Sequence, residues 1–229
     1  MTKQAIIIYG PPGAGKGTQA ELLTKKYNFI HFDTGRYIEG LIRSPEVKKS
    51  RILKREKKLF DSGKLCTPSW VLKVTREEAK RIREAGFGIV FSGSPRTIFE
   101  AFGGKSNEGL LLFLIKVYGL KNVSVLKLNV RDKSSFERNS IRKVCSVCGL
   151  PRLEKLAGRS NACVFCGGSM RTRSLDTKKV IKVRLKEYQE RTYPILKGAR
   201  KLGLRIYEIN GEPPPYKVYS QIVKKLKLQ

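Results

Sequence analysis

The sequence predicts an α/β protein in three layers, with a central parallel sheet of five strands between helices. Two observations favour this class. Short apolar runs alternate along the chain with longer amphipathic stretches, which is typical of a parallel sheet with crossover helices. The first run, residues 5–9, is apolar and ends at Gly10, as expected for a buried strand.

The remaining elements follow from the same alternation. Strands are expected at residues 5–9, 29–33, 88–93, 122–130 and 204–210. Helices are expected after Gly15, where Ala20, Leu23 and Tyr27 recur at helical spacing, and over residues 69–85, 109–119, 132–143, 180–202 and 216–228. Two stretches interrupt the alternation: a small helical insertion at residues 34–66 and a cysteine-rich segment at residues 145–166.

The stretch IIIYGPPGAGKGTQAELL, residues 6–23, contains the strongest motif. Gly10, Gly15 and Lys16 fit G-x-x-x-x-G-K between a strand and a helix. Glycines let backbone amides curl around phosphate oxygens, the helix N-terminus adds positive charge, and the lysine supplies a full charge. The alternative is a glycine-rich turn without a ligand, but the strand–loop–helix context favours phosphate binding.

Six stretches in order resemble the adenylate kinases, nucleoside-monophosphate kinases of the P-loop class. They are GPPGAGKGTQAELL from Gly10, DTGRYI from Asp33, SGKLCT from Ser62, SGSPRT from Ser92, ERNSIRKVC from Glu137 and RTRSLDTKKVIKVRL from Arg171. The resemblance implies a core of residues 1–33, 67–142 and 170–229, a monophosphate-binding insertion at 34–66 and a lid at 143–169. It implies direct, reversible transfer of the γ-phosphoryl group of ATP, bound with Mg²⁺, to AMP.

The resemblance also implies the site residues. The catalytic charges would come from Lys16, Arg96, Arg138, Arg142, Arg173 and Arg184, since phosphoryl transfer depends on positioning and dispersed positive charge. ATP would be bound by Gly13, Ala14, Gly15, Lys16, Gly17, Thr18, Arg138 and Arg142. The monophosphate would be bound by Thr34, Gly35, Lys64, Leu65, Cys66, Gly93, Arg96, Glu100, Arg173 and Arg184.

Four cysteines predict a structural zinc site in the lid. Cys145 and Cys148 form one C-x₂-C pair, and Cys163 and Cys166 form another. Four thiolates suit a closed tetrahedral Zn²⁺ site, and this spacing favours metal over disulfides in a cytosolic chain. The fifth cysteine, Cys66, is expected to be a small buried residue and not a metal ligand. His31 is expected to be structural.

Four positions depart from the family pattern. Glu39 stands where the family has an arginine, for which Arg36 or Arg43 is a possible substitute. Ser92 replaces an aspartate that organises the Mg²⁺ hydration shell, and Leu175 replaces the first of two aspartates after the lid, which leaves Asp176. We expect these losses to lower the rate without abolishing it.

The fourth departure is Glu100, at the position of a base-reading glutamine. An ionised glutamate only accepts hydrogen bonds, so it matches donors on guanine or the amine of cytosine better than a whole adenine edge. The acidic residue could also point elsewhere or accept from the adenine amine. AMP therefore stays the expected acceptor, with GMP, CMP or UMP as the alternative.

The chain has 229 residues, with 48 Lys and Arg against 19 Asp and Glu, so its net charge is +29. Seven of the eleven residues from Lys48 to Lys58 are basic, which is most often a solvated helix face. A second function is an RNA- or ribosome-associated nucleotide-binding protein with weak kinase activity, for which Arg142, Lys143, Arg152, Lys155 and Arg159 near the cysteines would give further contacts. We expect a cytoplasmic location, since no apolar run of about 18 residues could span a membrane. We also expect a monomer.

Overall fold

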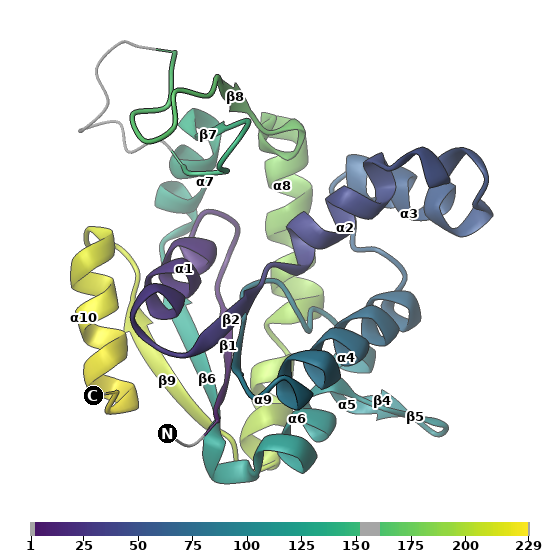
Figure 1. Ribbon diagram of the computed structural model, residues 1–229, viewed down its shortest axis with the longest axis vertical. Coiled ribbons are helices and arrows are strands. Elements are labelled where there is room, and N and C mark those ends of the chain that lie inside the picture. Colours follow the sequence, from purple (N-terminus) through teal and green to yellow (C-terminus); the bar gives the residue numbers. More distant parts are fainter. Residues whose placement is uncertain (1–2, 152–160, 229) are drawn as a thin grey trace.

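The computed structural model describes residues 3–151 and 161–228. Its central sheet has the spatial order β2-β3-β1-β6-β9, and every neighbouring pair is parallel. The strands are β1 (Ala5–Tyr9), β2 (Phe29–Phe32), β3 (Gly88–Phe91), β6 (Val123–Asn129) and β9 (Arg205–Asn210). The five-stranded parallel sheet expected from the sequence is confirmed (Figure 1).

Alternate residues along the strands pack into two separate hydrophobic cores. In β1, Ala5, Ile7 and Tyr9 join one core, whereas Ile6 and Ile8 join the other. The first core is covered by α4 (Pro68–Glu84), α5 (Ile98–Phe102), α6 (Leu110–Tyr118) and α9 (Ile195–Lys201). The second is covered by α1 (Lys16–Lys26) and α10 (Pro215–Leu226). These two helical layers and the sheet make the predicted three-layer architecture.

The insertion at residues 34–66 consists of short helices with a small core of their own. It contains α2 (Thr34–Arg43), the 3₁₀ turn η1 (Pro45–Lys48) and α3 (Arg51–Asp61). Asp33 and Ser50 cap the two α-helices, because their side chains accept hydrogen bonds from the backbone amides of Arg36 and Leu53. Ile38 and Ile42 of α2 and Phe60 of α3 pack with Cys66 and with Val71 at the start of α4.

The cysteine-rich segment is closed at its base by a two-stranded antiparallel sheet. Strands β7 (Lys143–Cys145) and β8 (Met170–Thr172) pair directly, so the segment leaves and rejoins the core at one place. Figure 1 shows this small sheet near the ends of α7 (Asp132–Ile141) and α8 (Lys178–Glu187), away from the central sheet. The 3₁₀ turn η3 (Ser174–Asp176) connects β8 to α8.

The prediction of one long helix over residues 180–202 is wrong, because two α-helices lie there with a π-helical turn between them. After α8, the segment Tyr188–Thr192 forms a π-helical turn, in which the amide of Tyr193 donates to the carbonyl of Tyr188. Pro194 follows and has no amide hydrogen to continue the helix, so α9 starts afresh at Ile195. The sequence pattern does not predict α5 or the hairpin of β4 (Gly103–Gly104) and β5 (Asn107–Glu108), because these elements are too short to show periodicity. The 3₁₀ turn η2 (Leu120–Asn122) precedes β6.

Helix length and polarity bear on the membrane prediction. Within residues 3–151 and 161–228, every helix is too short or too polar to cross a membrane.

Candidate active site

The turn between β1 and α1 has a shape that glycine adopts most easily. Gly10, Gly13 and Gly15 have positive φ values of 155°, 78° and 88°. A Cβ atom on Gly13 would lie 2.9 Å from the carbonyl oxygen of Ser135, so α7 packs directly against the turn. Gly15 has no side chain to cap α1, which leaves amides at this helix N-terminus available to an anion.

Lys16 lies inside this turn and is held by backbone oxygens. Its Nζ donates to the carbonyls of Gly10 at 2.7 Å and Pro11 at 2.9 Å. Burial lowers the pKa of Lys16 well below its ordinary value, and three nearby guanidinium groups lower it further. A bound phosphate would offset this repulsion, so the turn suits an anionic ligand.

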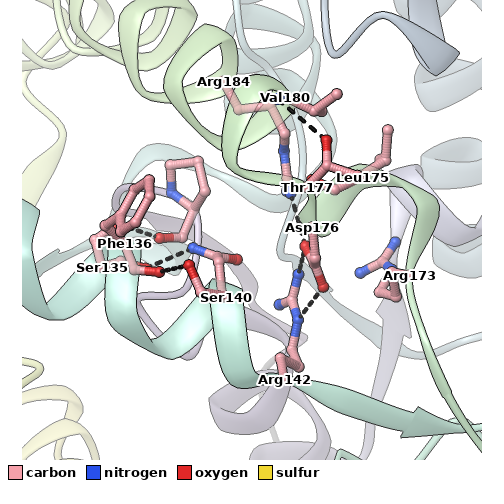
Figure 2. A network of polar contacts seen from close by, with 12 residues as sticks. Ser135, Phe136, Ser140, Arg142, Arg173, Leu175, Asp176, Thr177, Val180 and Arg184 are labelled. Carbon is pink, nitrogen blue, oxygen red and sulfur yellow. Dashed lines mark hydrogen bonds and ion pairs between the residues drawn. The ribbon is translucent and has the colours of Figure 1, made fainter.

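Two of these guanidinium groups, those of Arg142 and Arg184, contact the buried carboxylate of Asp176. Arg142 donates to Asp176 from Nε at 2.9 Å and from Nη2 at 2.6 Å, and Arg184 Nη1 lies 3.3 Å from the same carboxylate (Figure 2). The side chain of Asp176 is completely buried. Burial and the nearby charges of Arg96 and Arg142 lower the pKa of Arg184 to about 9. The cluster therefore carries more positive charge than its one carboxylate neutralises.

Arg173 joins this cluster from the segment that follows the lid. Figure 2 places its side chain beside Asp176 and Arg142. Burial lowers the pKa of Arg173, and the neighbouring charge of Arg142 lowers it further. Arg173 Nη2 lies 3.6 Å from Glu39 Oε2 on α2, so the acid that replaces the family's arginine is paired with a predicted catalytic cation.

Arg138 is held apart from this cluster. Its guanidinium donates to the carbonyl of Gly211 at 2.9 Å and to that of Glu212 at 2.8 Å, in the turn between β9 and α10. These contacts place Arg138 at the edge of the phosphate-binding turn, where it suits the nucleoside part of a ligand better than a transferring phosphoryl group.

A cavity opens between α2, α3 and the carboxyl end of β3. The hydroxyl oxygens of Thr34 and Ser94 are buried in its wall and have no hydrogen-bond partner among the described residues. Arg96 also lines it and donates from Nε to the carbonyl of Gly93 at 2.6 Å. The full lining is Thr34, Gly35, Ile38, Phe60, Lys64, Leu65, Cys66, Val71, Gly93, Ser94, Arg96 and Glu100. The residues predicted to bind the monophosphate thus lie together here, except Arg173 and Arg184.

Glu100 lies in the wall of this cavity and is 2% exposed. Its Oε2 accepts from the backbone amide of Arg96 at 2.8 Å, and its Oε1 accepts from the hydroxyl of Thr97 at 3.0 Å. Burial raises the pKa of Glu100 to about 7, although both hydrogen bonds favour the ionised form. Glu100 is therefore protonated more easily than an exposed glutamate.

The other departures from the family pattern have local explanations. Ser92 Oγ is hydrogen-bonded to His31 Nε2 at 2.7 Å, and His31 Nδ1 lies 2.8 Å from Glu21 Oε1, so this histidine joins β2, β3 and α1. Leu175 is buried in the small core of the insertion, and its carbonyl accepts from Arg184 at 3.3 Å. A carboxylate at that position would be buried among apolar side chains, where it is costly.

Neither suggested substitute for the missing arginine reaches the cavity. Arg43 donates to Asp61 on α3 at 2.8 Å. Arg36 lies against the lid instead, since a side chain at Gly149 would collide with its guanidinium. Neither belongs to the cavity lining among the described residues.

The four lid cysteines form a compact cluster. Their sulfur atoms all lie within 4.8 Å of one another, with Cys145 and Cys166 at 3.4 Å and Cys148 and Cys163 at 3.7 Å. A tetrahedral Zn²⁺ with Zn–S bonds of about 2.3 Å needs sulfur separations of about 3.8 Å, so these residues fit the ion. The amides of Val147 and Cys148 also donate to Cys145 Sγ.

Cys66 lies apart from this cluster, as the sequence suggested. It is buried in the wall of the cavity, and burial raises the pKa of its thiol to about 12. Of the cationic residues named near the lid, Arg152, Lys155 and Arg159 lie outside the described residues.

Two residues of α7 support the glycine turn, although the sequence predicted no role for them. Ser135 Oγ donates to the carbonyl of Pro12, and Asn139 Nδ2 donates to the carbonyl of Ser135 at 2.7 Å. Both side chains are fully buried. Their four-residue spacing on a basic helix was the one available signal, and it does not indicate what the helix packs against.

Comparisons with known proteins agree with this geometry. The family model described as adenylate kinase matches residues 8–203. The adenylate kinase of Methanothrix thermoacetophila is 32% identical over 226 residues, covering 96% of this chain and 97% of the relative. Those of Bacillus cytotoxicus (31% identical; 95% of each chain) and Caldicellulosiruptor bescii (30%; 90% of this chain and 92% of the relative) are also similar. The chain therefore belongs to the adenylate kinase family of phosphotransferases.

Proposed function

We propose that this protein transfers the γ-phosphoryl group of MgATP reversibly to AMP and gives two ADP. The observation that carries this proposal is the position of the arginine cluster. The charges of Arg96 in the cavity wall, Arg142 at the end of α7 and Arg184 on α8 all act on Lys16 in the glycine turn. Two phosphate groups, one on the turn and one in the cavity, would therefore meet among these cations.

The donor nucleotide is bound by the backbone of the turn and by nearby side chains. The amides of residues 13–18 surround the phosphates, and Lys16 gives up its carbonyl partners for the terminal phosphate oxygens. Arg142 closes over the phosphates, whereas Arg138 contacts the nucleoside part. Gly17 and Thr18 complete the donor site.

The acceptor nucleotide occupies the cavity. Thr34 Oγ1 has no other described partner and is available to the base, while Arg96 binds the phosphate. Arg173 and Arg184 reach both the acceptor and the transferring phosphoryl group. Gly35, Lys64, Leu65, Cys66, Gly93 and Glu100 shape the rest of the wall.

The reaction needs positioning and charge stabilisation, without a covalent intermediate. Lys16 and the arginine cluster neutralise charge on the oxygens of the transferring group. When bound with ATP, Mg²⁺ adds to this neutralisation. The insertion at 34–66 and the lid at 143–169 close on the core of 1–33, 67–142 and 170–229 and exclude water.

AMP is favoured over other acceptors by the state of Glu100. A protonated glutamate has one donor and one acceptor, as the family's glutamine does, and the pKa of about 7 keeps this form populated at neutral pH. The ionised form matches the donors of guanine or cytosine, so GMP, CMP or UMP stays the alternative acceptor.

We also propose that the four cysteines bind a structural Zn²⁺, since their sulfur separations suit a tetrahedral ion. The ion would fix the lid segment, with Cys145 and Cys148 held near β7 and Cys163 and Cys166 near β8. It takes no part in the chemistry, because four thiolates leave no open position.

Steady-state kinetics with MgATP and each of AMP, GMP, CMP and UMP test this proposal. We expect the highest kcat/KM with AMP. Higher activity with another monophosphate would reassign the acceptor, and turnover near the uncatalysed rate with all four would contradict the kinase function.

An RNA-binding role rests on a different observation. Arg51, Lys54, Arg55 and Lys58 are exposed on α3, away from the cavity. RNA binding that weakens steeply between 50 and roughly 200 mM salt, together with negligible turnover, would favour it over a metabolic kinase. The cytoplasmic location and the monomeric state expected from the sequence stay predictions.

A further inference from the structure

The carboxyl ends of β2 and β3 place Asp33 beside Ser92. The two strands are parallel, and Phe32 is opposite Phe91, so Asp33 and Ser92 follow at the same edge of the sheet. Opposed residues of parallel strands point to the same face. Two residues before Ser92, Val90 packs in the core under α1, so both side chains project on the face where α1 and the glycine turn lie.

Ser92 contributes no charge to this face. Its hydroxyl is hydrogen-bonded to His31, and its side chain is neutral where the family has an aspartate. A hydrated cation on the nucleotide phosphates would find no carboxylate at this position. Among the residues at the ends of β2 and β3, the nearest acid by strand register is Asp33.

One carboxylate oxygen of Asp33 accepts a hydrogen bond, and the other has no partner among the described residues. Its Oδ1 accepts from the backbone amide of Arg36 at 3.1 Å, and the described residues make no other hydrogen bond or ion pair to the carboxylate. Burial alone would raise the pKa of Asp33, but the Arg36 amide and nearby positive charges hold it below its ordinary value. The Asp33 charge also raises the pKa of Lys16, which places this anion within electrostatic reach of the phosphate-binding lysine.

We propose that Asp33 is the positioning residue that orders the water shell of the nucleotide-bound Mg²⁺, in place of the acid missing at Ser92. This inference rests on the proposed function. Mg²⁺ keeps several of its waters when it binds nucleotide phosphates, and a carboxylate accepts hydrogen bonds from such waters.

The test uses the 229-residue chain and its D33N, S92D and D33N/S92D variants. Asparagine caps helices as well as aspartate does, so D33N removes the charge and keeps the start of α2. The direct readout is the affinity of Mn²⁺ for the complex with a non-hydrolysable ATP analogue, measured by electron paramagnetic resonance. We expect D33N to weaken Mn²⁺ binding by roughly 10-fold or more, and D33N/S92D to recover most of that loss.

A charge-matched control is D61N, which removes an acid of α3 that is paired with Arg43 and Lys57. It should leave Mn²⁺ affinity unchanged. Mn²⁺ affinity of D33N within twofold of the wild type would overturn the proposal. So would an equal weakening of metal-free analogue binding, because that would indicate a general defect of the site.

These outcomes are separate from a failure of the proposed function. A wild-type protein that phosphorylates no monophosphate would refute the kinase assignment, but the Mn²⁺ affinities would still test Asp33. Thermal unfolding midpoints of the four proteins verify that each is folded, and D33S, which also keeps a capping side chain, is a second neutral variant if D33N is unstable.

Discussion

The proposed donor and acceptor halves of this site depend on different parts of the chain. The donor half depends on the backbone: positive-φ glycines, amides at the start of α1 and one lysine. The acceptor half depends on side chains that line a cavity, where Glu100 lies in the wall, and on Arg173, which is paired with Glu39. Backbone amides are unaffected by most substitutions, whereas a side-chain pocket can change its charge through one residue. The acceptor half is therefore where the chemistry of this chain can differ from that of its relatives.

The largest expected effect comes from the cluster that both halves share. Arg142→Ala removes a guanidinium bound twice to Asp176, and we expect kcat to fall by about 10² to 10⁵ because charge on the transferring group is left unneutralised. Arg81→Ala, on the exposed surface of α4, is the matched control and should keep wild-type kcat. A similar kcat for both variants would remove Arg142 from the mechanism.

The lid provides the next test. Cys148→Ser or a strong chelator should release one equivalent of Zn²⁺ and lower kcat by roughly 10-fold or more, because the lid would lose its folded shape. Metal content by mass spectrometry and kcat are measured together. Cys66→Ser is the control for thiol loss, since Cys66 lies outside the four-cysteine cluster, and it should keep the zinc. Full activity without metal would show that the ion is dispensable.

Glu39→Arg tests the charge of the proposed acceptor half. It removes the acid paired with Arg173 and restores the family's positive charge, so we expect the KM for AMP to fall by roughly 3- to 10-fold, or about 0.7 to 1.4 kcal/mol. The KM for ATP should change little. Glu46→Gln, in the exposed part of the same insertion, controls for general charge and should leave both constants unchanged. An unchanged KM for AMP in Glu39→Arg would place the phosphate elsewhere.

The smallest effect concerns the pH dependence of acceptor binding. Since the pKa of Glu100 is raised to about 7, the wild-type KM for AMP should increase several-fold between pH 6 and 8 as the carboxyl group loses its donor. Glu100→Gln should flatten this profile. An equally steep profile in the variant would assign the dependence to another group.

The raised pKa of Glu100 also makes the free energy of unfolding depend on pH. The folded-state pKa of Glu100 lies above the unfolded value of about 4.3, so the stabilisation from its protonated form is complete below that value and is lost as pH rises through 7. Thermal unfolding of Glu100→Gln should therefore show a weaker loss of stability over this range than the wild type.

By itself, the sequence determined the five strands of the central sheet, the phosphate turn and the paired cysteines, because each depends on residues close together in the chain. Tertiary structure decided the rest. Ser135 and Asn139 reach the turn from α7, and burial raises the pKa of Glu100 although the neighbouring hydrogen bonds and charges lower it. Parallel pairing of β2 and β3 puts Asp33 next to Ser92, although 58 residues lie between them. Charges act through space, so their partners depend on how distant segments pack, which no local pattern contains.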